Sequence, residues 1–108
     1  MTPYQAESQA EPSHDDVDRL RGPVVLEFGA SWCPHCQAIQ ADLEAALDQR
    51  PNVQHLKIED GRGKPLGRSF RVKLWPTLVF MHDGQVLEQF ARPSDEQLAQ
   101  GFEALDRG

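Results

Sequence analysis

The chain has only two cysteines among its 108 residues, and both lie in one short segment, at positions 33 and 36. One such pair cannot supply the framework of several disulfides that holds small secreted proteins together. A domain of this length buries enough apolar surface to fold without cross-links. In a reducing compartment, a close cysteine pair is more often catalytic, redox-sensing or metal-binding than structural.

Long hydrophobic runs are also missing. The most apolar segment, residues 24–30, is interrupted by Glu27, whereas a membrane-spanning helix needs about 18 consecutive apolar residues. Residues 1–8 lack both the cationic start and the apolar middle of a secretory signal peptide. We therefore expect no membrane association and a cytoplasmic location, or a periplasmic one if an export signal was removed ahead of residue 1.

Positive charge is scarce. There are 11 basic against 17 acidic residues, for a formal net charge of −6, and the basic residues are scattered singly. This composition argues against binding to nucleic acid or to acidic membranes. We expect a monomer with a flexible tail at residues 1–13, which are polar and proline-containing, and one domain at residues 14–108.

Hydrophobic periodicity and turn signals predict an alternation of helices and strands. Ser13 is expected to cap a first helix, and Ser94, followed three residues later by Gln97, is expected to cap the last one. Asp83-Gly84 is a hairpin signal. The predicted order is a helix from 14, a strand at 24–28, a helix at 34–49, a strand at 53–58, a short helix at 66–70, a hairpin of strands 77–81 and 86–90, and a helix to about 105.

The segment Trp32-Cys33-Pro34-His35-Cys36 follows the first strand directly and opens the second helix. Two thiols at this spacing can exchange electrons with the disulfide of another protein. Unpaired N–H groups at a helix start stabilise a thiolate, so Cys33 is the expected nucleophile. Cys36, one turn further, is placed to attack the mixed disulfide formed on Cys33. The thiols do this chemistry themselves, so no bound cofactor is implied.

Along residues 15–106 this order of elements, with Trp-Cys-x-x-Cys opening the second helix and Trp75-Pro76-Thr77 opening the hairpin, resembles the thioredoxin family. The resemblance implies an α/β thioredoxin fold, a three-layer α/β/α sandwich around a mixed sheet of four or five strands. It also implies a thiol-disulfide oxidoreductase that reduces or exchanges protein disulfides. Its partners would be disulfide-containing client proteins and an electron donor of the thioredoxin-reductase type.

Glu27 interrupts the first strand at the position where thioredoxins place a buried acid, usually Asp. A buried carboxyl should have a raised pKa and relay a proton to or from Cys36 during exchange. The alternative is a Glu27 that faces solvent from a strand edge, since alternation alone does not say which face is wet. His55 on the neighbouring strand can pair with Glu27, or can simply be exposed.

Pro76 matches the cis-proline of the family, whose loop faces the cysteines and binds an extended substrate segment. By resemblance, Trp75 and Thr77 on either side of it belong to the substrate-binding surface. Trp32 and Pro34, beside Cys33, are expected to supply further contact area. Ordinary packing is the alternative for Trp75 and for Trp32.

His35 lies between the cysteines, where a cationic imidazole would favour the thiolate and make the pair more oxidising. General reductants of the family carry Gly-Pro between the cysteines, whereas Pro-His is typical of DsbA-type disulfide oxidases. The interval from Cys36 to Pro76 is too short for the helical insertion of those oxidases. A DsbA-like oxidase or isomerase and a redox-regulated binding module remain alternatives. A zinc module lacks a second ligand pair.

Overall fold

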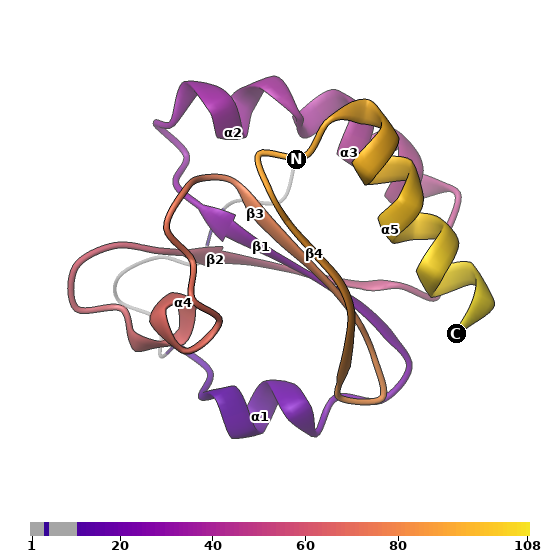
Figure 1. Cartoon of the computed structure of the whole chain (residues 1–108), viewed down its shortest axis with the longest axis horizontal. Coiled ribbons are helices and arrows are strands. Elements are labelled where there is room, and N and C mark those ends of the chain that lie inside the picture. The colour runs from indigo at the N-terminus through magenta and orange to yellow at the C-terminus, as the bar shows by residue number, and fades with distance from the viewer. Residues whose placement is uncertain (1–3, 5–10) are drawn as a thin grey trace.

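The computed structural model describes residue 4 and residues 11–108. None of the helices in this described part is long and apolar enough to cross a membrane. Figure 1 shows the elements, which are α1 (His14–Asp18), β1 (Pro23–Gly29), α2 (Pro34–Ala38), α3 (Gln40–Asp48), β2 (Gln54–Glu59), α4 (Pro65–Ser69), β3 (Thr77–His82), β4 (Gln85–Ala91) and α5 (Asp95–Arg107).

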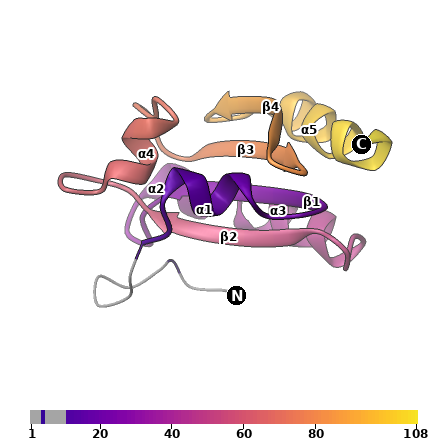
Figure 2. The ribbon, with the colours of Figure 1, turned by 90° about the horizontal axis from the view of Figure 1, so that it is seen from below.

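The sheet has four strands within the described residues, in the order β2-β1-β3-β4. β1 runs parallel to β2 and antiparallel to β3, and β3 and β4 form an antiparallel hairpin. Helices α1 and α4 lie on one side of this mixed sheet and α2, α3 and α5 on the other (Figures 1 and 2). The predicted three-layer α/β/α sandwich is confirmed.

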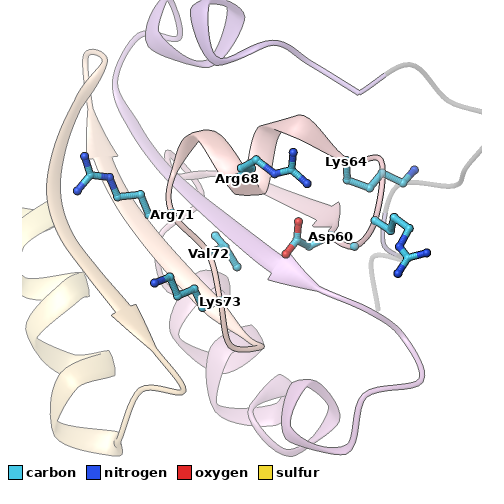
Figure 3. Close-up of a pocket in the computed structure, with 8 residues that line it drawn as sticks. Asp60, Lys64, Arg68, Arg71, Val72 and Lys73 are labelled. Carbon is cyan, nitrogen blue, oxygen red and sulfur yellow. The ribbon is translucent and has the colours of Figure 1, made fainter.

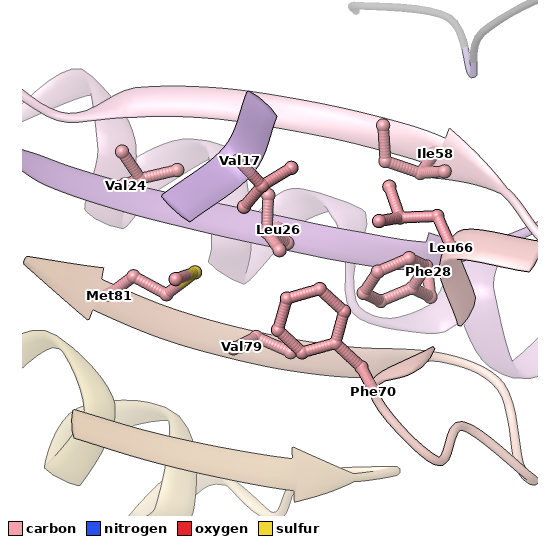
Figure 4. Packing of buried hydrophobic residues seen from close by; sticks show 9 residues of the cluster. All are labelled: Val17, Val24, Leu26, Phe28, Ile58, Leu66, Phe70, Val79 and Met81. Carbon is pink, nitrogen blue, oxygen red and sulfur yellow. The ribbon is translucent and has the colours of Figure 1, made fainter. Parts of the chain in front are cut away.

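The sheet separates two hydrophobic clusters, and alternation along β1 assigns each side chain to one of them. Leu26 and Phe28 point to the cluster under α1 and α4, shown in Figure 4, while Val25 points to the cluster under α3 and α5. Glu27 has the same parity as Val25, so it faces the side that carries α2 and α3. Strand β1 is buried on both faces, which is why its sequence reads as a continuous apolar run.

The predicted local signals form as expected. Ser13 and Ser94 each accept a hydrogen bond from the backbone three residues on, in reciprocal capping boxes. Asp83 and Gly84 both have positive φ, 49° and 83°, which matches a tight hairpin turn. Only glycine fits at position 84, because a Cβ there would lie 2.2 Å from the carbonyl oxygen of Asp18.

The single helix predicted over residues 34–49 is wrong, because the chain breaks at Ile39 into α2 and α3. The side-chain amide of Gln40 donates 2.8 Å to the carbonyl oxygen of Cys36, the acceptor that a continuous helix would use for the backbone N–H of Gln40. A side chain inserted into the hydrogen-bond ladder is a common cause of such a kink.

The predicted tail at residues 1–13 lies largely outside the described residues, so the domain boundary stays a prediction. The described part of this segment contacts the domain. Glu11 accepts a hydrogen bond of 2.8 Å from the backbone N–H of Leu66, and Tyr4 packs against the cluster of Ala30, Cys33 and Cys36. Tyr4 was not expected near the cysteines, because the polar residues around it carry no signal of burial.

Candidate active site

The cysteine pair lies where β1 ends and α2 begins. Cys33 is the N-cap of α2, with extended backbone angles, and Pro34 occupies the first turn, where its missing N–H costs nothing. Cys33 is 5% exposed and Cys36 is fully buried, and both are free thiols. The predicted roles need this difference, because the nucleophile has to reach a partner and the second thiol only has to reach the first.

The two thiols differ in acidity. Burial by itself would raise the pKa of Cys33. Hydrogen bonds from the Cys36 thiol and from the backbone N–H groups of Cys36 and His35, together with the charge of Arg92, outweigh burial and lower that pKa below its ordinary value. Burial raises the pKa of Cys36 to about 11. Cys33 is therefore the thiol that ionises first.

His35 reaches Cys33 through its backbone. Its N–H is one of the donors to the thiolate, while its side chain is exposed to solvent. The contribution of His35 to the Cys33 pKa is thus a main-chain one, which any residue except proline would supply, and the expected imidazole contribution stays a prediction. Pro34 is also exposed, beside the thiol.

Glu27 is fully buried, so the solvent-facing alternative is wrong. Its carboxylate accepts hydrogen bonds from the hydroxyl of Tyr4 and from the amide of Gln40 (2.7 Å), and it lies 2.8 Å from Nε2 of His55. The expected raised pKa is also wrong. Burial acts in that direction, but these hydrogen bonds and the charge of nearby Lys57 together lower the pKa of Glu27. The carboxylate stays ionised because its lone pairs are satisfied.

Gln40, Lys57 and Tyr4 complete this buried network, and sequence reasoning missed all three. Lys57 donates 2.9 Å to Oε1 of Gln40, and its ammonium lies 4.4 Å from the centre of the Tyr4 ring. Lys57 is paired with Glu27 in the register of β1 and β2, so its proximity follows from strand pairing that no local pattern shows. The signal that could have found it is Lys57 itself, a charged residue within the strand expected at residues 53–58.

The Trp75–Pro76 peptide bond is cis, as predicted, and the loop lies beside the cysteines. The indole N–H of Trp75 donates 2.8 Å to Asp60, and its ring meets that of Trp32 edge-on at 5.5 Å. Trp32 is 68% exposed, which leaves most of its surface to a partner. Thr77 is buried and its hydroxyl donates 2.7 Å to the carbonyl of Leu74, so it shapes the loop from within.

Arg92 was also missed. Its Nε donates 2.9 Å to the carbonyl oxygen of Trp75, and its backbone N–H donates 2.7 Å to that of Pro76. Arg92 therefore holds the proline loop in place and adds positive charge near Cys33. Its position just after a strand, before Pro93, is typical of a loop and gave no hint of this role.

A basic pocket, shown in Figure 3, is lined in part by Asp60, the residue whose carboxylate accepts the hydrogen bond from Trp75. It has a volume of about 630 Å³ and opens to solvent. Its basic lining residues, which we call the basic pocket residues, are Arg62, Lys64, Arg68, Arg71 and Lys73. Five of the 11 basic residues of an acidic chain thus line one hollow, and all five come from the single segment 62–73.

Across the described ranges, no three side chains of His, Cys, Asp and Glu come close enough together to hold a metal ion. The histidine nearest to the pair in sequence, His35, is exposed. The groups that contact the two thiols are hydrogen-bond donors and apolar side chains. Their arrangement suits a thiol that is alternately ionised and bonded to sulfur.

Sequence comparison places the chain among thiol-exchange proteins. The sequence model of the thioredoxin family matches residues 6–104. A thioredoxin H-type of Ricinus communis is 29% identical over 74% of this chain and 68% of its own length. Thioredoxin H-type 1 of Nicotiana tabacum is 32% identical over 71% of this chain and 61% of its own length.

Solved structures agree with this similarity. The structure of thioredoxin 2 from Pseudomonas aeruginosa PAO1 in its reduced form is 49% identical, with a TM-score of 0.82, over 99% of this chain and 98% of that one. Fasciola hepatica thioredoxin is 25% identical with a TM-score of 0.70, over 82% and 84% of the two chains. The likeness to the Pseudomonas protein covers both the cysteine segment and the proline loop.

Proposed function

The chain belongs to the thioredoxin family, and from that premise we propose that its thiol pair works as a monomeric cytoplasmic reductant and exchanger of client disulfides, recharged by a thioredoxin-reductase type of donor. Its thiol-disulfide oxidoreductase activity follows from the family. The observation that supports the proposed roles is the contrast between Cys33, with a lowered pKa, and Cys36, whose pKa is raised to about 11.

The reaction proceeds in two exchanges. The Cys33 thiolate attacks one sulfur of the client disulfide, forms a mixed disulfide and releases the first client thiolate. Cys36 then loses its proton and attacks Sγ of Cys33, which forms the Cys33–Cys36 disulfide and releases the second client thiolate. Two electrons pass from the pair to the client, and the donor returns them to the pair.

The reduction potential tests the direction. We expect a value near the roughly −270 mV of thioredoxins, whereas a value near the roughly −120 mV of DsbA would overturn the proposed direction. His35→Ala should shift the potential by less than about 30 mV, because the backbone N–H that contacts Cys33 remains. Equilibration with glutathione buffers measures the reduction potential of the unaltered protein and of His35→Ala. His82→Ala, at the end of β3 and away from the cysteines, serves as the control.

Client selection is part of the same proposal. The basic pocket residues lie against Asp60, which Trp75 binds, and Trp75 in turn contacts Trp32 beside the nucleophile. An acidic segment next to a client disulfide would thus meet positive charge while the disulfide meets Cys33. Because the rest of the chain is strongly acidic, this face would also orient such a client during encounter.

Charge reversal at the pocket tests this selection. We expect Arg68→Glu/Lys73→Glu to lower kcat/KM for a disulfide peptide with acidic flanks about tenfold at low salt, with a smaller loss at high salt. A peptide with neutral flanks should change less than about twofold. Arg107→Glu on α5, away from the pocket, is the matched control. An equal loss for both peptides would contradict selection by charge.

A further inference from the structure

The hydroxyl of Tyr4 lies between the buried carboxylate and the buried thiol. It donates a hydrogen bond to Oε2 of Glu27, and the Tyr4 side chain packs against the cluster that contains Cys36. Gly29 leaves the space for this meeting. A Cβ at position 29 would lie 2.5 Å from Sγ of Cys36 and 3.0 Å from the Tyr4 hydroxyl oxygen. The hydroxyl thus joins two groups on neighbouring elements.

Several contacts hold the Tyr4 ring in this position. Its apolar face packs on the cluster of Ala30, Cys33 and Cys36, and the ammonium of Lys57 lies over the ring at 4.4 Å. The titratable and charged groups around the hydroxyl are Glu27 of β1, His55 and Lys57 of β2, and Cys33 and Cys36 at α2. Burial and the charge of Glu27 raise the pKa of Tyr4 far above its usual range, so the phenol stays neutral.

The second exchange needs such a group. Cys36 has to lose its proton as it attacks Sγ of Cys33, yet burial raises the pKa of Cys36 to about 11, so its thiolate is scarce near neutral pH. The base that contacts the Tyr4 hydroxyl is Glu27, which is ionised because its hydrogen bonds lower its pKa. The Tyr4 hydroxyl lies between the two, so it can accept the thiol proton while it gives its own proton to Glu27, and its charge does not change.

We propose that Tyr4 is the proton relay of the resolving step, passing the Cys36 proton to Glu27 as the Cys33–Cys36 disulfide forms. The thiol proton of Cys36 moves to the Tyr4 oxygen while the phenolic proton moves to Oε2 of Glu27. Electrons move only between sulfurs, and Tyr4 is neutral before and after. Nε2 of His55, 2.8 Å from Oε1 of Glu27 on a side chain that is 15% exposed, lies on the way out to solvent.

The relay rests on the proposed role of Cys36, and one experiment separates the two ideas. Reduced protein is mixed with excess 5,5′-dithiobis(2-nitrobenzoate) in a stopped-flow instrument. The first thiolate released reports attack by Cys33 and depends on reagent concentration. The second thiolate released reports attack by Cys36, and its rate does not depend on reagent concentration. Absence of the second phase in the unaltered protein would overturn the proposed function together with the relay.

Tyr4→Phe keeps the ring and removes the hydroxyl. We expect the second phase to slow about tenfold or more at pH 7, with the first phase within about twofold of the unaltered protein. The defect should shrink as the pH rises toward 10, because Cys36 then ionises without help. A second phase that is unchanged, or that is slowed equally at every pH, would overturn the relay, the latter because it indicates packing alone.

Three further variants sharpen the test. Glu27→Gln removes the proton acceptor, so Tyr4→Phe/Glu27→Gln should be no slower than the slower single variant, whereas independent effects would multiply. Glu11→Ala removes a different contact of the N-terminal segment, the one with Leu66, but leaves the hydroxyl in place. It should leave the second phase unchanged, and a defect as large as that of Tyr4→Phe would overturn the relay.

Discussion

We expect Cys33→Ser to lower the rate of insulin disulfide reduction by about three orders of magnitude or more, because no other thiol is placed to make the first attack. Cys33 caps α2 and receives the hydrogen bonds that favour its thiolate, whereas Cys36 is fully buried behind it. Cys36→Ser also stops turnover but leaves the first attack intact. The client then stays bound to Cys33 as a mixed disulfide, which mass spectrometry detects.

Alkylation at pH 7 provides the companion measurement. Iodoacetamide should label Cys33 well before Cys36, since only the Cys33 pKa is lowered and only Cys33 has exposed surface. Raising the pH toward 11 brings Cys36 into reaction only if its burial is also relieved. Labelling of Cys36 first, or a stable mixed disulfide on Cys33→Ser, would reverse the assigned roles.

Phe80→Ala should lower the free energy of unfolding by about 3–5 kcal/mol, a large part of what a domain of this size possesses. Phe80 on β3 is fully buried and meets the rings of Phe90 and Phe102 edge-on, with centroids 6.3 and 5.3 Å away. Gly101 lets α5 approach closely, since a Cβ there would lie 2.3 Å from the Phe80 ring. Truncation leaves a cavity that the rigid sheet and helix cannot fill.

Guanidinium unfolding followed by fluorescence measures this loss. Val86→Ala on β4 is the matched control, because Val86 is 48% exposed and its truncation should cost about 0.5 kcal/mol or less. Similar losses for the two variants would show that the cluster under α3 and α5 is not the stabilising core that its burial indicates.

Much of the fold was predictable because its signals are local. Ser13 and Ser94 mark helix starts through side chains that bond to their own next turn, and Asp83-Gly84 marks the hairpin through permitted positive φ. The break at Ile39 was not predictable. It depends on Gln40 being drawn into the interior by Glu27 and Lys57, partners 13 and 17 residues away in sequence.

The reactive pair was predictable, but the state of its neighbours was not. Glu27 was identified by its place in an apolar strand, yet the direction of its pKa shift reversed once Tyr4, Gln40 and His55 were placed around it. Desolvation can be inferred from burial alone. Hydrogen bonding to the charged form depends on which donors the folded chain brings within reach.

By itself the sequence determined that this is a small α/β domain with one pair of thiols at a helix start, because spacing, capping and turn chemistry act between residues close along the chain. The proline loop that faces the pair was expected from the resemblance to the thioredoxin family. Only the tertiary structure decided what surrounds that pair. Strand pairing sets Lys57 beside Glu27, the N-terminal segment brings Tyr4 to Cys36, and β4 delivers Arg92 to the proline loop. Electrostatics and proton transfer depend on distances through space, and these arise only when segments far apart in sequence pack together.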